Sequence, residues 1–213
     1  MKKNLLAALV LGATLVPALQ GCFPVVAAGV TTGVLATLDR RTLGTQTEDD
    51  TIDIKAALRL GDKLGDKAHT NVTTYNRKVL LTGEVATEEA KTAAAAVVSE
   101  VTNVQGVHNE LTVAAPTSYS DRSNDAFITS KIKGRFVDSG KFNPVHVKVV
   151  TEAGIAYLLG MVTQPEADAA IGVARTTSGV KKVVNLLEII TPAKARELDI
   201  AQKSTPPAET KAQ

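Results

Sequence analysis

An internal repeat is the feature of this chain that most constrains its fold. Three blocks of the 213-residue sequence recur in the same order, at offsets of 74 to 77 residues. A fixed order at a nearly constant offset indicates a tandem duplication of about 70 residues, and therefore two similar domains. The paired blocks are Ile54 and Leu58 with Ile128 and Ile132; Val79, Leu81, Gly83 and Val85 with Ala156, Leu158, Gly160 and Val162; and Val104, Val107, Asn109, Leu111 and Val113 with Val180, Val183, Asn185, Leu187 and Ile189.

Each copy predicts the order helix, strand, strand, helix, strand, and the second copy begins with a helix signal. The polar residues Ser123 to Asp125 offer N-cap oxygens. The helix after them would have an apolar face at Ile128, Ile132 and Phe136. Valines at positions 145, 147 and 149 alternate along a strand, and Ala153-Gly154 turns the chain into the next one.

Local signals also mark the second half of each copy. Thr163 as cap and Glu166 three residues later predict the start of the second helix. Gly179 is suited to a left-handed residue that ends this helix, and residues 180–190 form the last strand. The first copy has Asn103 in place of Gly179 and Asn76 in its turn, and Asn tolerates the same conformation.

The first 21 residues are typical of a secretory signal peptide. Lys2 and Lys3 precede an apolar run of about a dozen residues, which is too short to cross a hydrocarbon core of ~30 Å. An N-terminal buried helix is the alternative. The only cysteine, Cys22, follows Leu-Gln-Gly and resembles the lipobox of bacterial lipoproteins, although Gln20 stands where a small residue is usual. One cysteine excludes an internal disulfide and a cysteine-based zinc cluster.

The lipobox resemblance implies that the Cys22 thiol is acylated, for example with palmitate, and becomes the new N-terminus. A second acyl chain on the freed amine would give stable anchoring, since one chain holds only marginally. Phe23 and Pro24 follow Cys22. Because an Asp at the first of these positions favours inner-membrane retention in lipoproteins, its absence implies the outer membrane, with the chain facing the periplasm.

Charge is divided unevenly between the two copies. The whole chain has 24 Lys and Arg against 22 Asp and Glu, and removal of Lys2 and Lys3 with the signal peptide leaves 22 of each. Residues 48–114 carry seven basic and eleven acidic side chains, net −4, and residues 123–191 carry eight and six, net +2. An anionic partner such as a membrane surface would therefore meet the second copy.

The remaining segments connect these parts. Residues 22–47 are interpreted as a flexible, lipidated tether, with packing on the first domain as the alternative. Residues 115–122 form a short linker between domains at 48–114 and 123–191, and the signal peptide takes residues 1–21. Residues 192–213 are predicted as a disordered tail with an optional short helix at 193–202.

The repeated pattern resembles the BON domain. The likeness rests on the strand Gly154-x-Ala156-x-Leu158-x-Gly160-x-Val162 and on the ending Val180-x-x-Val183-x-Asn185. With the lipobox and two copies, residues 22–191 resemble the dual-BON outer-membrane lipoproteins, the family of division- and outer-membrane-stress-associated lipid-binding proteins. Residues 41–50 and 123–133 carry the likeness further.

This resemblance implies an α+β fold of two tandem BON domains, each αββαβ with a small three-stranded mixed sheet packed on two helices. It implies a non-enzymatic protein that supports envelope integrity and gathers at sites of cell division. It further implies that the second domain binds anionic phospholipid through its first helix.

The residues of that helix suit a lipid interface. Phe127 is one step from the Ile128 face and would stand at the helix edge. An apolar ring at headgroup depth, with basic side chains near phosphates, favours an anionic membrane. The alternative is that Phe127 covers the edge of the sheet and the cations are a solvated face. The predicted phospholipid-binding residues are Phe127, Lys131, Lys133 and Arg135.

Other chemistry finds little support in the sequence. His69, His108 and His146 lie far apart without a HExxH pattern, so we predict three independent histidines and no metal site. No nucleotide-binding or nucleophile motif is present, which predicts no enzyme and no cofactor. Aromatic residues make up 3% of the chain, which argues against base stacking on nucleic acid. Gly83 and Gly160 predict a close backbone approach or a bulge.

A second function of another class stays open. The first domain could dock an envelope or division protein as a scaffold, with membrane contact only through the lipid on Cys22. The sequence leaves the headgroup preference and the oligomeric state unknown.

Overall fold

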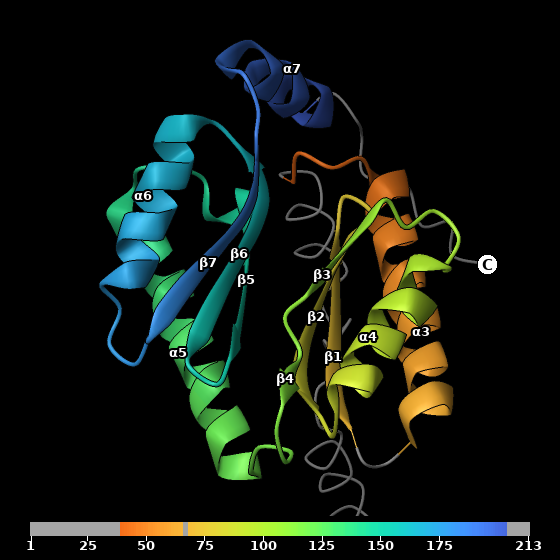
Figure 1. The fold of residues 1–213 in the computed structure, drawn as a ribbon. Helices are drawn as coiled ribbons and strands as arrows, with labels where there is room; N and C mark the ends of the chain where they lie inside the picture. The colour runs from red at the N-terminus through yellow and green to blue at the C-terminus, as the bar shows by residue number, and fades with distance from the viewer. Residues whose placement is uncertain (1–38, 66–67, 204–213) are drawn as a thin grey trace, which may run out of the picture.

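The computed structural model describes residues 39–65 and 68–203. The predicted signal peptide, Cys22, most of the predicted tether and the last ten residues lie outside the described residues. The described chain forms two domains whose sheets face each other, with two helices on the outer face of each sheet (Figure 1). The order of layers is therefore helix, sheet, sheet, helix.

Domain 1 has the predicted order of elements. It consists of α3 (Leu43–Leu64), β1 (His69–Tyr75), β2 (Lys78–Val85), α4 (Glu88–Ser99), β3 (Gly106–Asn109) and β4 (Thr112–Val113). The central strand β2 pairs antiparallel with β1 and parallel with β3 and β4. The sheet has four strands instead of the expected three, because the last strand is divided into β3 and β4 between Asn109 and Thr112.

Domain 2 repeats this arrangement with a three-stranded sheet. It consists of α5 (Tyr119–Ser139), the 3₁₀ turn η3 (Pro144–His146), β5 (Val147–Glu152), β6 (Ile155–Val162), α6 (Gln164–Arg175) and β7 (Lys182–Ile189). The central strand β6 pairs antiparallel with β5 and parallel with β7. Both domains thus have the mixed sheet and the α+β fold that the sequence predicts.

The first helix of each domain shows that one predicted pairing of residues between the two copies is wrong. In α5, Ile128, Ile132 and Phe136 are buried as predicted. In α3, however, Ile54 and Leu58 are 63% and 65% exposed, so their match to Ile128 and Ile132 is wrong. The buried residues of α3 are Asp49, Ile52, Ala56 and Leu60, each 76 positions before its counterpart. This face is hard to recognise in the sequence, because Ala56 is small and Asp49 is polar, so the four positions do not form a row of large apolar residues.

The start of α5 also differs from the prediction. Ser118 is its N-cap and forms a capping box with Asp121, so Ser123, Asn124 and Asp125 lie inside the helix. Residues 119–122 of the predicted linker therefore belong to domain 2. The capping box of Ser118 and Asp121 satisfies two N–H groups at the helix end. Ser123, Asn124 and Asp125 are therefore not needed as caps.

Asp125 has a different role, which Asp49 shares. Asp125 accepts hydrogen bonds from the N–H groups of Ala153 and Gly154, both at 2.8 Å. Asp49 accepts from the N–H groups at positions 76 and 77, at 2.8 and 2.7 Å. All four turn residues have positive φ, so a buried carboxylate on the first helix holds each hairpin turn in a left-handed conformation.

Several other local predictions are confirmed. Thr163 and Glu166 form a capping box at the start of α6. Asn103 and Gly179 have φ of 70° and 97°, in the left-handed region. However, α6 ends at Arg175 with Thr176 as its C-cap, so Gly179 lies in the turn after the helix and does not end it. Gly83 and Gly160 allow a close backbone approach, since a Cβ on either would lie about 2 Å from a histidine carbonyl oxygen, at 2.1 and 2.2 Å.

The two sheets pack through an apolar interface. Tyr75 and Leu80 of domain 1 form a buried cluster with Tyr157 and Leu159 of domain 2. The Asn76 amide and the Lys78 ammonium both contact the Glu188 carboxylate across the interface at 3.1 Å. Each sheet is therefore covered on both faces, and the two domains form one body.

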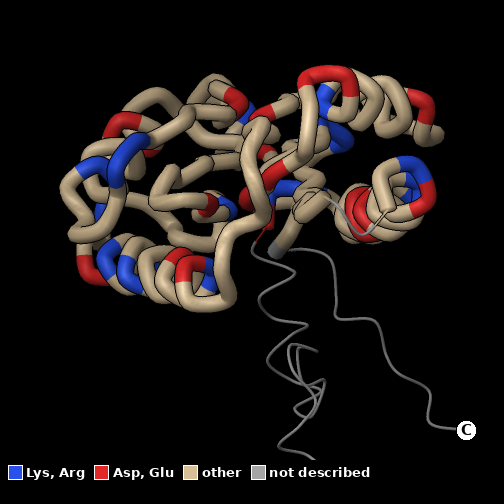
Figure 2. Tube along the Cα trace, turned by 60° about the horizontal axis from the view of Figure 1, so that its bottom comes forward, with Lys and Arg blue, Asp and Glu red and all other residues tan. Residues whose placement is uncertain are grey.

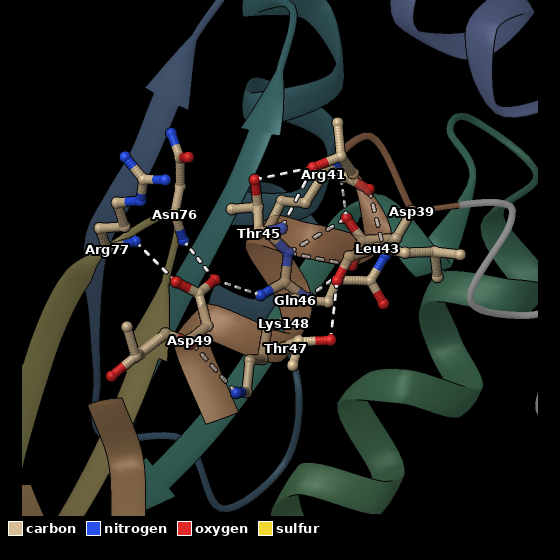
Figure 3. A network of polar contacts seen from close by, with 12 residues as sticks. Asp39, Arg41, Leu43, Thr45, Gln46, Thr47, Asp49, Asn76, Arg77 and Lys148 are labelled. Atoms are coloured by element: carbon tan, nitrogen blue, oxygen red, sulfur yellow. Dashed lines mark hydrogen bonds and ion pairs between the residues drawn. The ribbon is translucent and has the colours of Figure 1, made fainter. Parts of the chain in front are cut away.

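Residues before α3 are also part of this body, in contrast to the predicted tether at 22–47. Arg40 forms ion pairs with Glu166 of domain 2, at 2.8 Å, and with Asp199, at 2.9 Å. Arg41 pairs with Asp39 and with Asp49, at 2.6 and 2.7 Å, as Figure 3 shows. The alternative, packing on the first domain, describes Arg41, while Arg40 packs on domain 2 and Asp199, and residues 43–47 form the start of α3. The ion pairs compensate the burial of the two arginines.

The predicted tail begins with a helix, as the sequence allowed. α7 (Pro192–Lys203) buries Ala195 and Gln202, and the Gln202 amide donates to the Arg41 carbonyl at 2.8 Å. Figure 1 shows α7 at one end of the molecule, close to the start of the described chain. Within residues 39–65 and 68–203, none of the helices has the length and apolar character needed to cross a membrane.

Candidate membrane-contact surface

The outward face of α5 presents an exposed aromatic ring beside a cation. Phe127 is 62% exposed, although it neighbours the buried Ile128. The Lys131 ammonium lies 4.8 Å from the centre of the Phe127 ring, one helical turn away. The ring therefore does not cover the edge of the sheet but stands in solvent with a cation against its face.

Lys131 and Arg135 also stabilise the end of α6. The Lys131 ammonium donates to the Ser178 carbonyl. The Arg135 guanidinium donates to the Val173 carbonyl at 3.0 Å and to the hydroxyls of Thr176 and Thr177 at 3.0 and 2.8 Å. These cations lie at a helix C-terminus, where carbonyl groups lack intrahelical partners and the helix dipole is negative.

Lys133 lies on the other side of the exposed face. At about 100° per residue, Lys133 is about 120° around α5 from Phe127, whereas Lys131 and Arg135 lie about 40° and 80° away in the opposite direction. The four predicted residues therefore do not form one compact cluster. Instead, Lys131 and Arg135 flank Phe127 on one side, and the exposed Lys133 flanks the face on the other.

The structure adds two apolar residues that the sequence reasoning missed. Tyr119 is 86% exposed and Val137 is 66% exposed, and both lie on the exposed arc between Phe127 and Lys133. The Arg122 guanidinium lies 5.2 Å from the centre of the Tyr119 ring. Tyr119 was assigned to the linker, so a correct helix start would have placed it on this face.

Comparison with known proteins identifies the family. The model of the BON domain matches residues 48–115 and 124–191. Outer membrane lipoprotein DolP of Haemophilus influenzae is 36% identical over 86% of this chain and 95% of its own length. The 21 kDa hemolysin of Actinobacillus pleuropneumoniae is 32% identical over 72% of this chain and 80% of its own. The chain belongs to the BON-domain family. Osmotically-inducible protein Y of Escherichia coli is also similar, at 32% identity over 65% of this chain and 70% of its own.

The two BON domains differ in the charge around their exposed apolar residues. In BON domain 1, Ile54 and Leu58 are exposed on α3, one turn apart. Charges of both signs surround them: Asp50 and Asp62 lie four residues before and after, and the exposed cations Lys55 and Arg59 directly follow them. In BON domain 2, the equivalent helix has cations on both flanks. Figure 2 shows positions of both charges on each domain, and the difference between the domains is one of balance: net −4 for residues 48–114 and net +2 for residues 123–191.

Proposed function

We propose that this BON-domain protein is an outer-membrane lipoprotein that faces the periplasm and binds anionic phospholipid through α5 of BON domain 2. The similarity to a protein named outer membrane lipoprotein over 86% of the chain supports the location. The lipobox-like residues before Cys22 support the anchor. The role is binding rather than catalysis, in support of envelope integrity and at division sites.

One observation carries the lipid-binding proposal: Phe127 is exposed, with the Lys131 ammonium against its ring. A large apolar side chain in water loses free energy when it enters the interfacial region of a bilayer. Cations on both sides of the exposed arc would each contribute about 1 kcal/mol near an anionic surface. The face of α5 thus combines an apolar insertion point with electrostatic attraction.

Liposome binding by a single charge variant tests this proposal. Phe127→Glu places a carboxylate at the centre of the surface and should abolish binding to liposomes containing phosphatidylglycerol, without loss of folding, since the side chain is exposed. The matched control is Ile54→Glu, which changes an equally exposed residue of BON domain 1 and should bind as the unaltered protein does. Unchanged binding by Phe127→Glu would contradict the assigned surface.

The anchor has a separate test. Metabolic labelling with a palmitate analogue should mark the protein in cells, and Cys22→Ala should lose the label because the chain has no other thiol. A label retained by Cys22→Ala would overturn the assignment of Cys22 as the lipidated residue.

The exposed pair Ile54 and Leu58 favours a second candidate function, docking of an envelope protein on BON domain 1. Both aliphatic side chains lie on the outer face of α3, in a domain of net charge −4 over residues 48–114, which suits a protein partner better than an anionic membrane. A photo-crosslinker at position 58 in cells should then give one stoichiometric protein adduct. Adducts only with lipid, or none, would contradict this candidate.

A further inference from the structure

A second cluster of ionisable side chains lies where the two domains meet. His69 begins β1, and Glu84 is its direct partner on β2. Glu152 ends β5 of BON domain 2. One ligand-type atom from each of these three side chains lies within 4.8 Å of the other two. The sequence analysis predicted no metal ligand among the histidines. The cluster at His69 could not be recognised there, because Glu152 belongs to the other domain and lies far from His69 in the sequence.

The two carboxylates of this cluster are buried. Glu84 is 4% exposed and Glu152 is 8% exposed. The His69 Nδ1 atom lies 2.9 Å from Glu84 Oε2. The hydrogen bonds that reach Glu152 come from uncharged groups, the Asn71 amide at 2.7 Å and the Thr82 hydroxyl at 3.3 Å. Two anionic groups this close in a buried site repel each other, and a bound cation would remove that cost.

A polar hollow gives access to this cluster. It is lined by His69, Asn71 and Glu152, and by Ala126 and Thr129 of α5. Arg122 also lines it, but its guanidinium donates to the Thr117 carbonyl, at 3.0 Å, and lies over the Tyr119 ring. An ion could therefore enter from solvent and reach both domains.

We propose that His69, Glu84 and Glu152 bind a first-row transition-metal dication, Zn²⁺ or Mn²⁺, which links the two BON domains. One imidazole nitrogen and two carboxylate oxygens suit these ions, with water completing the coordination. Ligands about 2.1 Å from a tetrahedral ion lie about 3.4 Å apart. His69 Nδ1 and Glu84 Oε2 now share a hydrogen bond at 2.9 Å, and the Thr117 N–H also donates to Glu84 Oε2 at 3.1 Å. Metal binding through His69 Nδ1 would replace the His69–Glu84 hydrogen bond and release its proton, and the ligand atoms, which lie within 4.8 Å of one another, would move closer around the ion.

The repeat shows that this site is not simply duplicated with the fold. Positions 77 residues after His69 and Glu84 are His146 and Met161. His146 lies beside Glu166 and Asp199 instead, and Met161 offers no carboxylate. The Arg40 guanidinium pairs with both of those carboxylates, at 2.8 and 2.9 Å. The cluster at Glu152 differs, because the hydrogen bonds to Glu152 come from the uncharged side chains of Asn71 and Thr82.

Metal titration of the purified mature protein tests the proposal. After treatment with EDTA, calorimetry with Zn²⁺ and with Mn²⁺ should show one ion per chain for at least one of the two. At about 100-fold excess over Kd, that ion should raise the Tm by roughly 5–10 °C. Glu152→Gln should lose the binding, and its Tm without metal should not fall, because the change removes one of two repelling charges.

His108→Gln is the matched control, since it removes a half-buried histidine from β3 and leaves the cluster intact. It should bind the ion as the unaltered protein does. Absence of binding by the unaltered protein, or unchanged binding by both Glu152→Gln and His69→Gln, would overturn the proposal. X-ray absorption of the Zn²⁺-loaded protein gives a test without variants: one imidazole with oxygen ligands is expected, and a spectrum with no imidazole would contradict the site.

Discussion

At the scale of single residues, two buried aspartates connect distant parts of each domain. Asp49 and Asp125 are 1% and 5% exposed, and each accepts two backbone hydrogen bonds from a hairpin turn 27 to 29 residues later. A carboxylate that accepts two N–H groups in a buried site gives strong, charge-assisted bonds. The turn conformation and the position of the first helix therefore depend on one side chain.

We expect Asp125→Ala to lower the free energy of unfolding by about 2–4 kcal/mol, because it leaves the N–H groups of Ala153 and Gly154 without partners. Urea denaturation measures this change. Asn124→Ala is the control, since Asn124 is the exposed neighbour on the same helix, and its effect should stay within about 0.5 kcal/mol. Equal effects of the two substitutions would show that the turn does not depend on Asp125.

At the scale of elements, α5 combines packing, capping and the proposed contact with lipid. Its inner face fills the core of BON domain 2, and its outer face carries Phe127. Between these faces, Lys131 and Arg135 donate to the C-terminal turn of α6 and to the residues after it. These two cations therefore have a structural function already, whereas Lys133 is exposed on the opposite flank.

This difference predicts that substitutions of Lys133 and Arg135 have different effects on the stability of the protein. Lys133→Ala should weaken binding to phosphatidylglycerol liposomes about fivefold, equivalent to about 1 kcal/mol, with stability unchanged. Arg135→Ala should weaken liposome binding and, in addition, lower the free energy of unfolding by about 1 kcal/mol, since it removes hydrogen bonds at the end of α6. Parallel denaturation and liposome co-sedimentation measure both quantities, and a Lys133→Ala variant that binds normally would exclude that flank from the surface.

At the scale of the whole molecule, the start of the described chain packs against BON domain 2 and the C-terminal helix α7. Arg40 contacts Glu166 of BON domain 2 and Asp199 of α7. Figure 1 shows this junction at the end of the molecule opposite to the first turn of α5. The 17 residues from Cys22 to residue 38 can span at most about 60 Å, more than the roughly 31 Å length of α5. An anchor at Cys22 would therefore allow α5 to meet the same membrane.

The junction predicts a specific sensitivity to acid. Burial acts to raise the pKa of the Glu166 carboxyl, but hydrogen bonds from Arg40 and Thr163 outweigh it and lower the pKa from 4.5 to about 2. Because the unfolded chain takes up this proton first as the pH falls, the contribution to stability is complete above pH 4.5 and is lost towards pH 2. It amounts to about 3 kcal/mol at most.

Denaturation at several pH values checks this prediction. Glu166→Gln should be less stable than the unaltered protein at neutral pH, and its stability should fall less between pH 4.5 and 2. Asp168→Asn changes an exposed carboxylate on the same helix and should leave the acid sensitivity in place. If Glu166→Gln lost stability with acid as steeply as the unaltered protein, the assigned role of this ion pair would be wrong.

The sequence predicted the elements whose signals are local. The capping box at Thr163 and the left-handed Asn103 and Gly179 are confirmed because each depends on residues within one turn. The buried face of α3 was misplaced because exposed Ile54 and Leu58 imitate the spacing of a core face. The link from Asp125 to its turn was missed, since it joins residues 28 and 29 positions apart.

The packing of the two sheets was also missed, although the sequence contains a signal for it. Residues 79–81 and 156–159 are continuous apolar runs and not alternating ones, which indicates strands covered on both faces. In the structure, Leu80 and Leu159 face the other domain, while Leu81 and Leu158 face their own helices. Phe127 was predicted at the helix edge but lies on the outer face of α5, where it is 62% exposed. Asp125 and Phe136 are buried together with Ile128 and Ile132, so the centre of the inner face lies almost opposite to Phe127.

The central claim, that Phe127 meets an anionic membrane, can be measured at that residue. The chain has no tryptophan, so Phe127→Trp introduces a single fluorophore at the proposed contact, and Ile54→Trp does the same on BON domain 1. With liposomes containing phosphatidylglycerol, emission from position 127 should shift to shorter wavelength and be quenched by brominated lipid, while emission from position 54 stays unchanged. An unshifted, unquenched signal from position 127 would contradict the account.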